Sequence, residues 1–246
     1  MAKKETKVKK APVKEKAVKK SVAKKETVSL EKLLESGAHF GHQAKRWNPK
    51  MAEYLYGQED GVSVFDLVKT KENLELALSA LIDAKKAGLS ILLVGTKKQV
   101  QLKVKEIAES TGILYINQRF LGGTFTNFDQ IKKSIRKLAT LKDDMKNGVY
   151  AAYTKKEKLL LAREIEDLEK KFAGIAKMEK LPDMVIIIDT HRENGAVMES
   201  RNMKIKTVGL VDSNADPNLI DYPIPMNDDA VKALDYVLDL MKAALS

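Results

Sequence analysis

The chain has 246 residues, no cysteine, 44% hydrophobic residues and a formal net charge of +10. This length allows one large domain or two modest ones, each with its own core. The lack of cysteine excludes disulfides, thiolate metal sites and a cysteine nucleophile, and no apolar run approaches the roughly 18 to 20 residues of a membrane span. Because the amino terminus also lacks the apolar core of a signal peptide, we expect a cytoplasmic protein.

The positive charge is concentrated at one end of the chain. Residues 1–27 contain eleven Lys and three Glu, so the remainder carries only +2. Within it, residues 111–150 carry +4 and residues 181–246 carry −5. We expect a polyanion to be steered toward the basic segments and away from the carboxyl-terminal part.

Residues 1–27 consist mainly of Lys, Ala, Val and Glu, with almost no large apolar groups. Such a segment buries too little surface to offset its ordering entropy, which predicts a disordered tail. The tail is either a phosphate-binding arm or a solubilising extension. Residues 28–246 are predicted to form the folded domain.

The first predicted helix is SLEKLLES, in which Ser29 is the expected cap and Gly37 the expected stop. It leads into GAHFGHQAKRWNPKM, from Gly37 to Met51, which combines rings, cations and amides and contains no carboxylate. Gly37, Gly41 and Pro49 predict a loop here. Cations bind phosphates, rings stack on unpaired bases and amides hydrogen-bond to base edges, so this loop is our main candidate RNA contact. Its candidate residues are His39, Phe40, His42, Gln43, Lys45, Arg46, Trp47, Asn48 and Lys50. The alternative is a surface loop with Phe40 and Trp47 buried in the core.

Alternating apolar segments and helical patterns follow. We predict strands at GVSVFD (around Val62 and Val64), at 89–94 and at 114–116, and helices from Thr70 to about Gly88 and from about Lys97 to Ser110. A fully apolar strand that leads directly into a helix is typical of a parallel sheet covered on both faces.

The pattern changes between Arg119 and Lys180. Apolar residues recur at helical spacing from Phe128 to Met145, and Leu161, Ile165, Leu168, Phe172 and Ile175 follow heptad spacing after Asn147-Gly148. This predicts an antiparallel coiled-coil αα-hairpin, inserted over residues 126–179. The hairpin either docks a partner or only buries its own seam.

Strand and helix patterns resume after the hairpin, with strands at 184–189 and 207–212, a helix at 194–203, a YPIP segment and a helix from about Asp228. We therefore predict an α/β fold with a doubly wound, mostly parallel open sheet, of the flavodoxin-like type.

In such folds ligands bind at the carboxyl ends of the strands. Asp189, Asp212, Asp216 and Asp221 lie in those regions and could hold Mg²⁺ for phosphoryl transfer, which is the enzyme hypothesis. Each of these residues also suits a turn or a helix cap. His39 and His42 have the spacing of metal ligands, but the neighbouring Lys45 and Arg46 disfavour a bound cation.

Two further segments are candidate RNA contacts. VGTKK lacks the glycine spacing of a nucleotide-binding loop, yet Lys97 and Lys98 could meet phosphates. FLGGTFTNF follows Arg119, contains a Gly pair suited to close backbone approach, and offers Thr124 and Asn127 as hydrogen-bonding groups. The alternative is that Thr126 or Asn127 only caps the hairpin helix.

Five motifs, GAHFGHQAKRWNPKM, LLVGTKKQ, NQRFLGGTFTNF, LPDMVIIIDT and VDSNADPNLIDYPIPMNDDA, together resemble the family of the bacterial small-subunit ribosomal protein number two, over about residues 28–245. The sequence departs from the family pattern at Phe120, where Trp is common, and at Met226, where Gly is common.

The resemblance implies a structural, non-enzymatic component of the small ribosomal subunit that binds rRNA at the junction of head and body and takes part in translation. It implies no cofactor, metal or membrane. The implied partners are small-subunit rRNA, neighbouring small-subunit proteins and the multi-OB-fold ribosomal protein that recruits mRNA. A docking protein outside the ribosome is the third hypothesis, beside this one and the enzyme.

Overall fold

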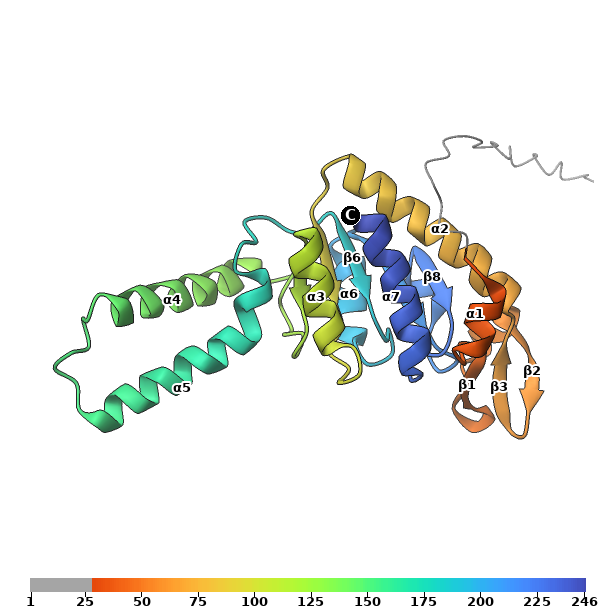
Figure 1. Cartoon of the computed structure of the whole chain (residues 1–246), viewed down its shortest axis with the longest axis horizontal. Coiled ribbons are helices and arrows are strands. Elements are labelled where there is room, and N and C mark those ends of the chain that lie inside the picture. Colours follow the sequence, from red (N-terminus) through yellow and green to blue (C-terminus); the bar gives the residue numbers. More distant parts are fainter. Residues whose placement is uncertain (1–27) are drawn as a thin grey trace, which may run out of the picture.

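The computed structural model describes residues 28–246, so the prediction for the tail at 1–27 lies outside the described residues. The described chain forms a five-stranded sheet flanked by helices, a small three-stranded sheet at one end and a pair of long helices at the other (Figure 1). No helix in residues 28–246 is long and apolar enough to cross a membrane.

The larger sheet is parallel throughout, in the order β5-β4-β6-β7-β8. Its strands are β4 (Ile91–Val94), β5 (Leu114–Ile116), β6 (Met184–Ile187), β7 (Lys206–Val211) and β8 (Tyr222–Pro225). β5 follows β4 on one side of the sheet, whereas β7 and β8 follow β6 on the other side. The order in which the strands are added therefore reverses between β4 and β6. This confirms the prediction of an α/β fold with a mostly parallel sheet of the flavodoxin-like type.

Helices cover both faces of this sheet, which explains why β4 and β6 are apolar at every position. One face packs against α2 (Leu67–Lys86), α3 (Gln101–Thr111) and α7 (Val231–Leu245), whose buried side chains share a core with Leu93 and Ile186. The other face, with Leu92 and Ile187, packs against α6 (Asn194–Asn202) and the base of the long helices. Alternate residues along each strand therefore serve two separate cores.

The small sheet is antiparallel, in the order β1-β3-β2, with β1 (Phe40–Gln43), β2 (Leu55–Glu59) and β3 (Val62–Phe65). Asp60 and Gly61 connect β2 to β3 with φ angles of 50° and 75°. The prediction of a loop from Gly37 to Met51 was therefore wrong for Phe40–Gln43, which pairs with β3 through backbone hydrogen bonds that sequence periodicity does not reveal. The predicted strand around Val62 is confirmed as β3.

The first helix, α1 (Leu30–Glu35), begins where the sequence predicted: the Ser29 hydroxyl accepts a hydrogen bond from Lys32 N. Gly37 follows it with a φ of +78°. A residue with a side chain would be strained in this conformation.

The long helices α4 (Phe128–Lys146) and α5 (Lys155–Phe172) lie side by side between β5 and β6 in the chain and extend away from the sheets (Figure 1). Thr154 caps α5 in a reciprocal capping box with Glu157. Lys137 of α4 lies 2.5 Å from Glu164 of α5, and Lys142 pairs with Glu169. These exposed ion pairs connect the two helices along their length.

Four short 3₁₀ turns complete the described chain: η1 (Ala44–Arg46), η2 (Pro49–Tyr54), η3 (Ala173–Ile175) and η4 (Pro217–Leu219). Met226, which stands where the resembled family commonly has Gly, is fully buried, and its N–H donates to the Val211 carbonyl. The larger side chain therefore packs into the core rather than disturbing the turn. Phe120 packs edge to face on Phe125 at 5.4 Å.

Candidate nucleic-acid interface

The segment from Gly37 to Met51 lies against the carboxyl end of β7. The Asn48 N–H donates to the Ser213 carbonyl at 2.6 Å, and the His42 N–H donates to the Ser213 hydroxyl at 2.8 Å. Gly41 permits this approach, because a Cβ there would lie 2.9 Å from Ser213 Oγ and 3.0 Å from the Ser63 carbonyl. The segment is therefore fixed to the edge of the sheet where this fold type binds ligands.

Lys45 and Arg46 are the cations that this arrangement leaves available. Both are exposed in η1, and neither makes an ion pair with any residue in the range 28–246. Lys50 is also exposed, but its ammonium lies 2.5 Å from Asp216. Gln43 is exposed beside them, and the side chain of Asn48 accepts from Lys50 N to cap η2.

The rings of this segment have different environments. Phe40 is 49% exposed and lies 4.0 Å from the His39 ring, centroid to centroid. Trp47 is half-buried. The alternative in which both Phe40 and Trp47 enter the core is therefore wrong for Phe40, whose ring remains accessible.

His42 links the small sheet to the larger one. Its Nδ1 lies 2.9 Å from Oδ1 of the fully buried Asp212, and its Nε2 lies 3.8 Å from Asp229. The hydrogen bond to Asp212 raises the pKa of His42, while burial acts in the opposite direction. His42 is therefore a structural connector as well as a polar group at the edge.

Lys97 follows β4 and is buried. Its ammonium lies 2.7 Å from Asp228 Oδ1, 2.7 Å from the Asp228 carbonyl, 2.6 Å from Asp229 and 3.4 Å from Asp189. Burial lowers the pKa of Lys97, but hydrogen bonds with Asp228 and Asp229 outweigh it, so the pKa is raised overall. Because all three ammonium protons have acceptors inside the protein, this geometry disfavours the predicted phosphate contact by Lys97. Lys98 is exposed.

The groups around Lys97 also shift the pKa of Asp228. Burial, together with Asp212 and Asp189, raises the pKa of Asp228 to about 7, although Lys97 lowers it. An open pocket of about 700 Å³ lies above the cluster. Its carboxylates come from Asp189, Asp228 and Asp229, and its exposed cations come from Arg46 and Arg192.

The second predicted contact begins at Arg119, which is exposed beyond β5 and so at the same edge of the sheet. Thr124 is buried and donates to the Leu121 carbonyl, which leaves it unavailable to a ligand and disfavours its predicted role. Asn127 is exposed at the start of α4, where its side chain makes no capping hydrogen bond.

The backbone of this second segment is already bound by a carboxylate. Glu199 accepts hydrogen bonds from the N–H groups of Gly123, Phe125 and Thr126, at 2.6, 2.9 and 3.2 Å. The Gly122-Gly123 pair was predicted to allow close approach of another chain, but the turn that contains it binds the Glu199 carboxylate of the same chain. Sequence reasoning missed Glu199, because no motif relates it to a turn more than seventy residues earlier.

Each of the four aspartates of the enzyme hypothesis has partners within the protein, and Asp189 lies 3.4 Å from the Lys97 ammonium. Asp216 caps η4 and pairs with Lys50, and Asp221 accepts from the N–H and hydroxyl of Thr207. Asp212 accepts from Ser213, His42 and the Asp228 N–H. Within residues 28–246 no three His, Cys, Asp or Glu side chains form a group that could hold a metal ion.

A family model described as "Ribosomal protein S2" matches residues 33–246. A curated relative, "Small ribosomal subunit protein uS2" of Coprothermobacter proteolyticus, is 43% identical over 218 residues, which cover 89% of this chain and 81% of the relative. The match includes both candidate segments.

Proposed function

The chain belongs to the ribosomal protein S2 family, and from this premise we propose that it binds rRNA of the small ribosomal subunit at the junction of head and body. Its family is that of a structural constituent of the ribosome, so it is not an enzyme, and its place is the ribosome in the cytoplasm.

Exposed, unpaired cations beside an accessible ring carry the proposal for the Gly37 to Met51 segment. Lys45 and Arg46 supply charge for phosphates, and Phe40 supplies a face for an unpaired base. Gln43 can bond to base edges or 2′-hydroxyls. Lys98 and Arg119 follow β4 and β5 at the same sheet edge and extend the proposed surface along it, and Asn127, exposed at the start of α4, is its last proposed contact.

The experiment measures how the affinity of the full chain for small-subunit rRNA depends on salt. Replacing Lys45 and Arg46 with Ala should reduce the slope of log K against log salt by about 0.7 to 0.9 for each lost phosphate contact. The control replaces Lys86 and Lys180, which lie next to the amino ends of β4 and β6, at the opposite edge of the sheet. An unchanged slope in the first variant would remove the segment from the interface.

Membership of the subunit has its own test. When a lysate is sedimented at high salt, the chain should travel with the small subunit. Its absence from that fraction would favour the docking protein outside the ribosome.

We further propose that residues 126–179 act as an inserted coiled-coil hairpin. The heptad spacing of Leu161, Ile165 and Leu168 and the ion pairs between α4 and α5 support this.

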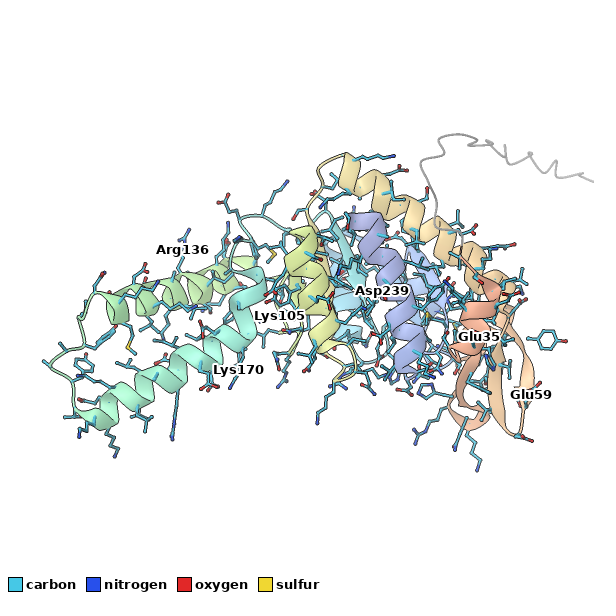
Figure 2. The ribbon with its side chains drawn as sticks, viewed as in Figure 1. Glu35, Glu59, Lys105, Arg136, Lys170 and Asp239 are labelled. Atoms are coloured by element: carbon cyan, nitrogen blue, oxygen red, sulfur yellow. The ribbon has the colours of Figure 1, made fainter. Side chains whose placement is uncertain are left out.

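A protein-docking surface is the last part of the proposal. An apolar groove of about 580 Å³ lies between α1, the small sheet and the start of α2. Leu34, Tyr56 and Val68 in it are 54%, 82% and 54% exposed, which marks a contact surface, and the acidic residues that line it favour a protein neighbour over RNA. Its charged lining residues are Glu31, Glu59 and Asp66, and Figure 2 shows Glu35 and Glu59 at this same end of the molecule. We propose that a neighbouring small-subunit protein docks in this groove, with the multi-OB-fold mRNA-recruiting protein as the candidate. If a Tyr56→Ala variant bound the purified candidate with unchanged affinity, this protein would be excluded as the occupant of the groove.

A further inference from the structure

Figure 1 shows the connection between α4 and α5 as the part of this pair farthest from the sheets. In this hairpin tip, residues 145–160, the exposed large apolar residues are Met145, Val149, Tyr153, Leu159 and Leu160, with exposures between 43% and 60%. The rings of Tyr150 and Tyr153 meet edge to face with centroids 5.1 Å apart. A group of neighbouring exposed apolar side chains marks a contact surface.

Some lysines of α4 and α5 make ion pairs and others do not; within residues 28–246, Lys132, Lys133 and Lys171, outside the tip, are among those without one. Lys137, Lys142 and Lys170 each pair with a glutamate of α5. In contrast, Lys146, Lys155 and Lys156 make no ion pair with any residue that the structure describes. Residues 145–160 contain four lysines and one glutamate, so the tip carries a net charge of +3.

The nearby carboxylates of Glu157 and Asp144 accept hydrogen bonds from neutral groups of the tip and make no ion pair with its lysines. Glu157 accepts from the N–H and the hydroxyl of Thr154 at 2.8 Å each, and Asp144 accepts from the Tyr150 hydroxyl at 3.0 Å. Lys158 donates to the Ala151 carbonyl and closes the turn. What remains accessible is three cations beside ring and aliphatic surface.

We propose that the hairpin tip is a second, separate RNA-binding surface, which holds an unpaired or looped RNA segment by stacking on Tyr153 and by contacts of Lys146, Lys155 and Lys156 with phosphates. A polyanion that also offers flat apolar faces satisfies both features of the tip at once. The inference rests on the proposed function, since the RNA is the same rRNA. It adds that the chain contacts this RNA at two places, one at the carboxyl edge of the five-stranded sheet and one at the hairpin tip.

Site-directed cleavage tests this directly, because the chain contains no native cysteine. An iron chelate tethered to Ala152→Cys in the assembled small subunit should cleave rRNA beside the tip. The same probe on Ala52→Cys, which lies in η2 directly after the Gly37 to Met51 segment, tests the proposed function independently. Cleavage from Ala52→Cys alone overturns the tip proposal and leaves the proposed function intact, while no rRNA cleavage from either position contradicts both.

Binding measurements provide the second test. Replacing Lys146, Lys155 and Lys156 with Ala should reduce the salt slope of rRNA affinity by about two, at roughly 0.7 for each single-stranded phosphate contact. Tyr153→Ala should weaken binding by at least about fivefold, and Tyr153→Phe should retain it, because stacking needs the ring and not the hydroxyl.

The control replaces Lys86, Lys177 and Lys180, which are exposed and lie away from the tip; of these three, Lys180 has an ion-pair partner, Asp183 at 3.8 Å. An equal loss of slope in the control would mean nonspecific charge attraction. Unchanged rRNA binding by the tip variants, with crosslinks from the tip to protein only, would make the tip a protein contact and overturn the inference.

Discussion

His42 and Asp212 connect the two sheets of the molecule, with 2.9 Å between His42 Nδ1 and Asp212 Oδ1. One residue belongs to β1, and the other follows β7 and is fully buried. The candidate RNA-binding segment is therefore held by a bond whose strength depends on protonation of His42.

This relationship predicts a dependence of stability on pH. Because the folded state raises the pKa of His42, the added stability is fully present below the unfolded pKa of about 6.5 and is lost as pH rises through the folded pKa. His42→Ala should reduce this loss, measured as the free energy of unfolding in urea between pH 6 and 8. His191→Ala, which removes an exposed histidine, should keep the wild-type slope. Asp228, with a pKa raised to about 7, also loses a stabilising proton as pH rises from about 4 to 7, so some slope should remain in every variant.

Lys97 and Lys98 are adjacent in sequence and opposite in role. Lys97→Met should destabilise the protein by about 3 to 5 kcal/mol, because it leaves Asp189 and Asp228 buried without their cation. Lys98→Met should change the unfolding free energy by less than about 0.5 kcal/mol, since its side chain is exposed. Urea denaturation of the two variants measures this difference. Equal stability of the two would contradict the structural role assigned to Lys97.

Glu199 should control the order of the turn that leads into α4. Glu199→Ala removes the acceptor of three backbone N–H groups, so the amides of Gly123, Phe125 and Thr126 should exchange with solvent faster than in wild type. Glu199→Gln, which keeps acceptor oxygen but loses the charge, should show a smaller increase. Hydrogen exchange read at single residues measures both. Unchanged exchange at these amides in the Ala variant would show that the turn is held by other contacts.

Gly174 should be intolerant of any side chain. A Cβ there would lie 2.1 Å from the Tyr115 carbonyl oxygen, so backbone at the base of the hairpin or in β5 must shift. We expect Gly174→Ala to lower the unfolding free energy by about 1 to 3 kcal/mol. Gly122→Ala is the matched control, because its Cβ would meet nothing within 4 Å. A thermal melt in which both variants match the wild type would refute this packing.

Much of the fold could be predicted because the buried strands and amphipathic helices have strong patterns. The apolar segments at Leu93 and Ile186 predicted parallel strands, and Ser29 predicted a helix start. The small sheet was only partly predicted, because Phe40–Gln43 and Leu55–Glu59 are short and largely exposed. The Asp60-Gly61 pair was the available signal, since it is typical of a two-residue hairpin turn.

The candidate RNA interface was harder to predict, because residue type indicates chemistry but not exposure. Lys97 and Lys98 are equally basic in the sequence, yet only the structure separates a buried ion pair from a free cation. Asp228, one of the partners of Lys97, lies 131 residues later in the chain. No local pattern relates positions so distant.

The neighbouring strands β4 and β6 are separated in the chain by β5 and the whole α4 and α5 pair. The centre of the sheet can therefore form only after a long loop has closed, which raises contact order and slows folding. Local pairing of α4 with α5 brings the ends of most of that loop together beforehand. We therefore expect α4 and α5 to pair first and the centre of the sheet to form afterwards. Early pairing of these helices would shorten the loop that must close before β4 and β6 can pair in register.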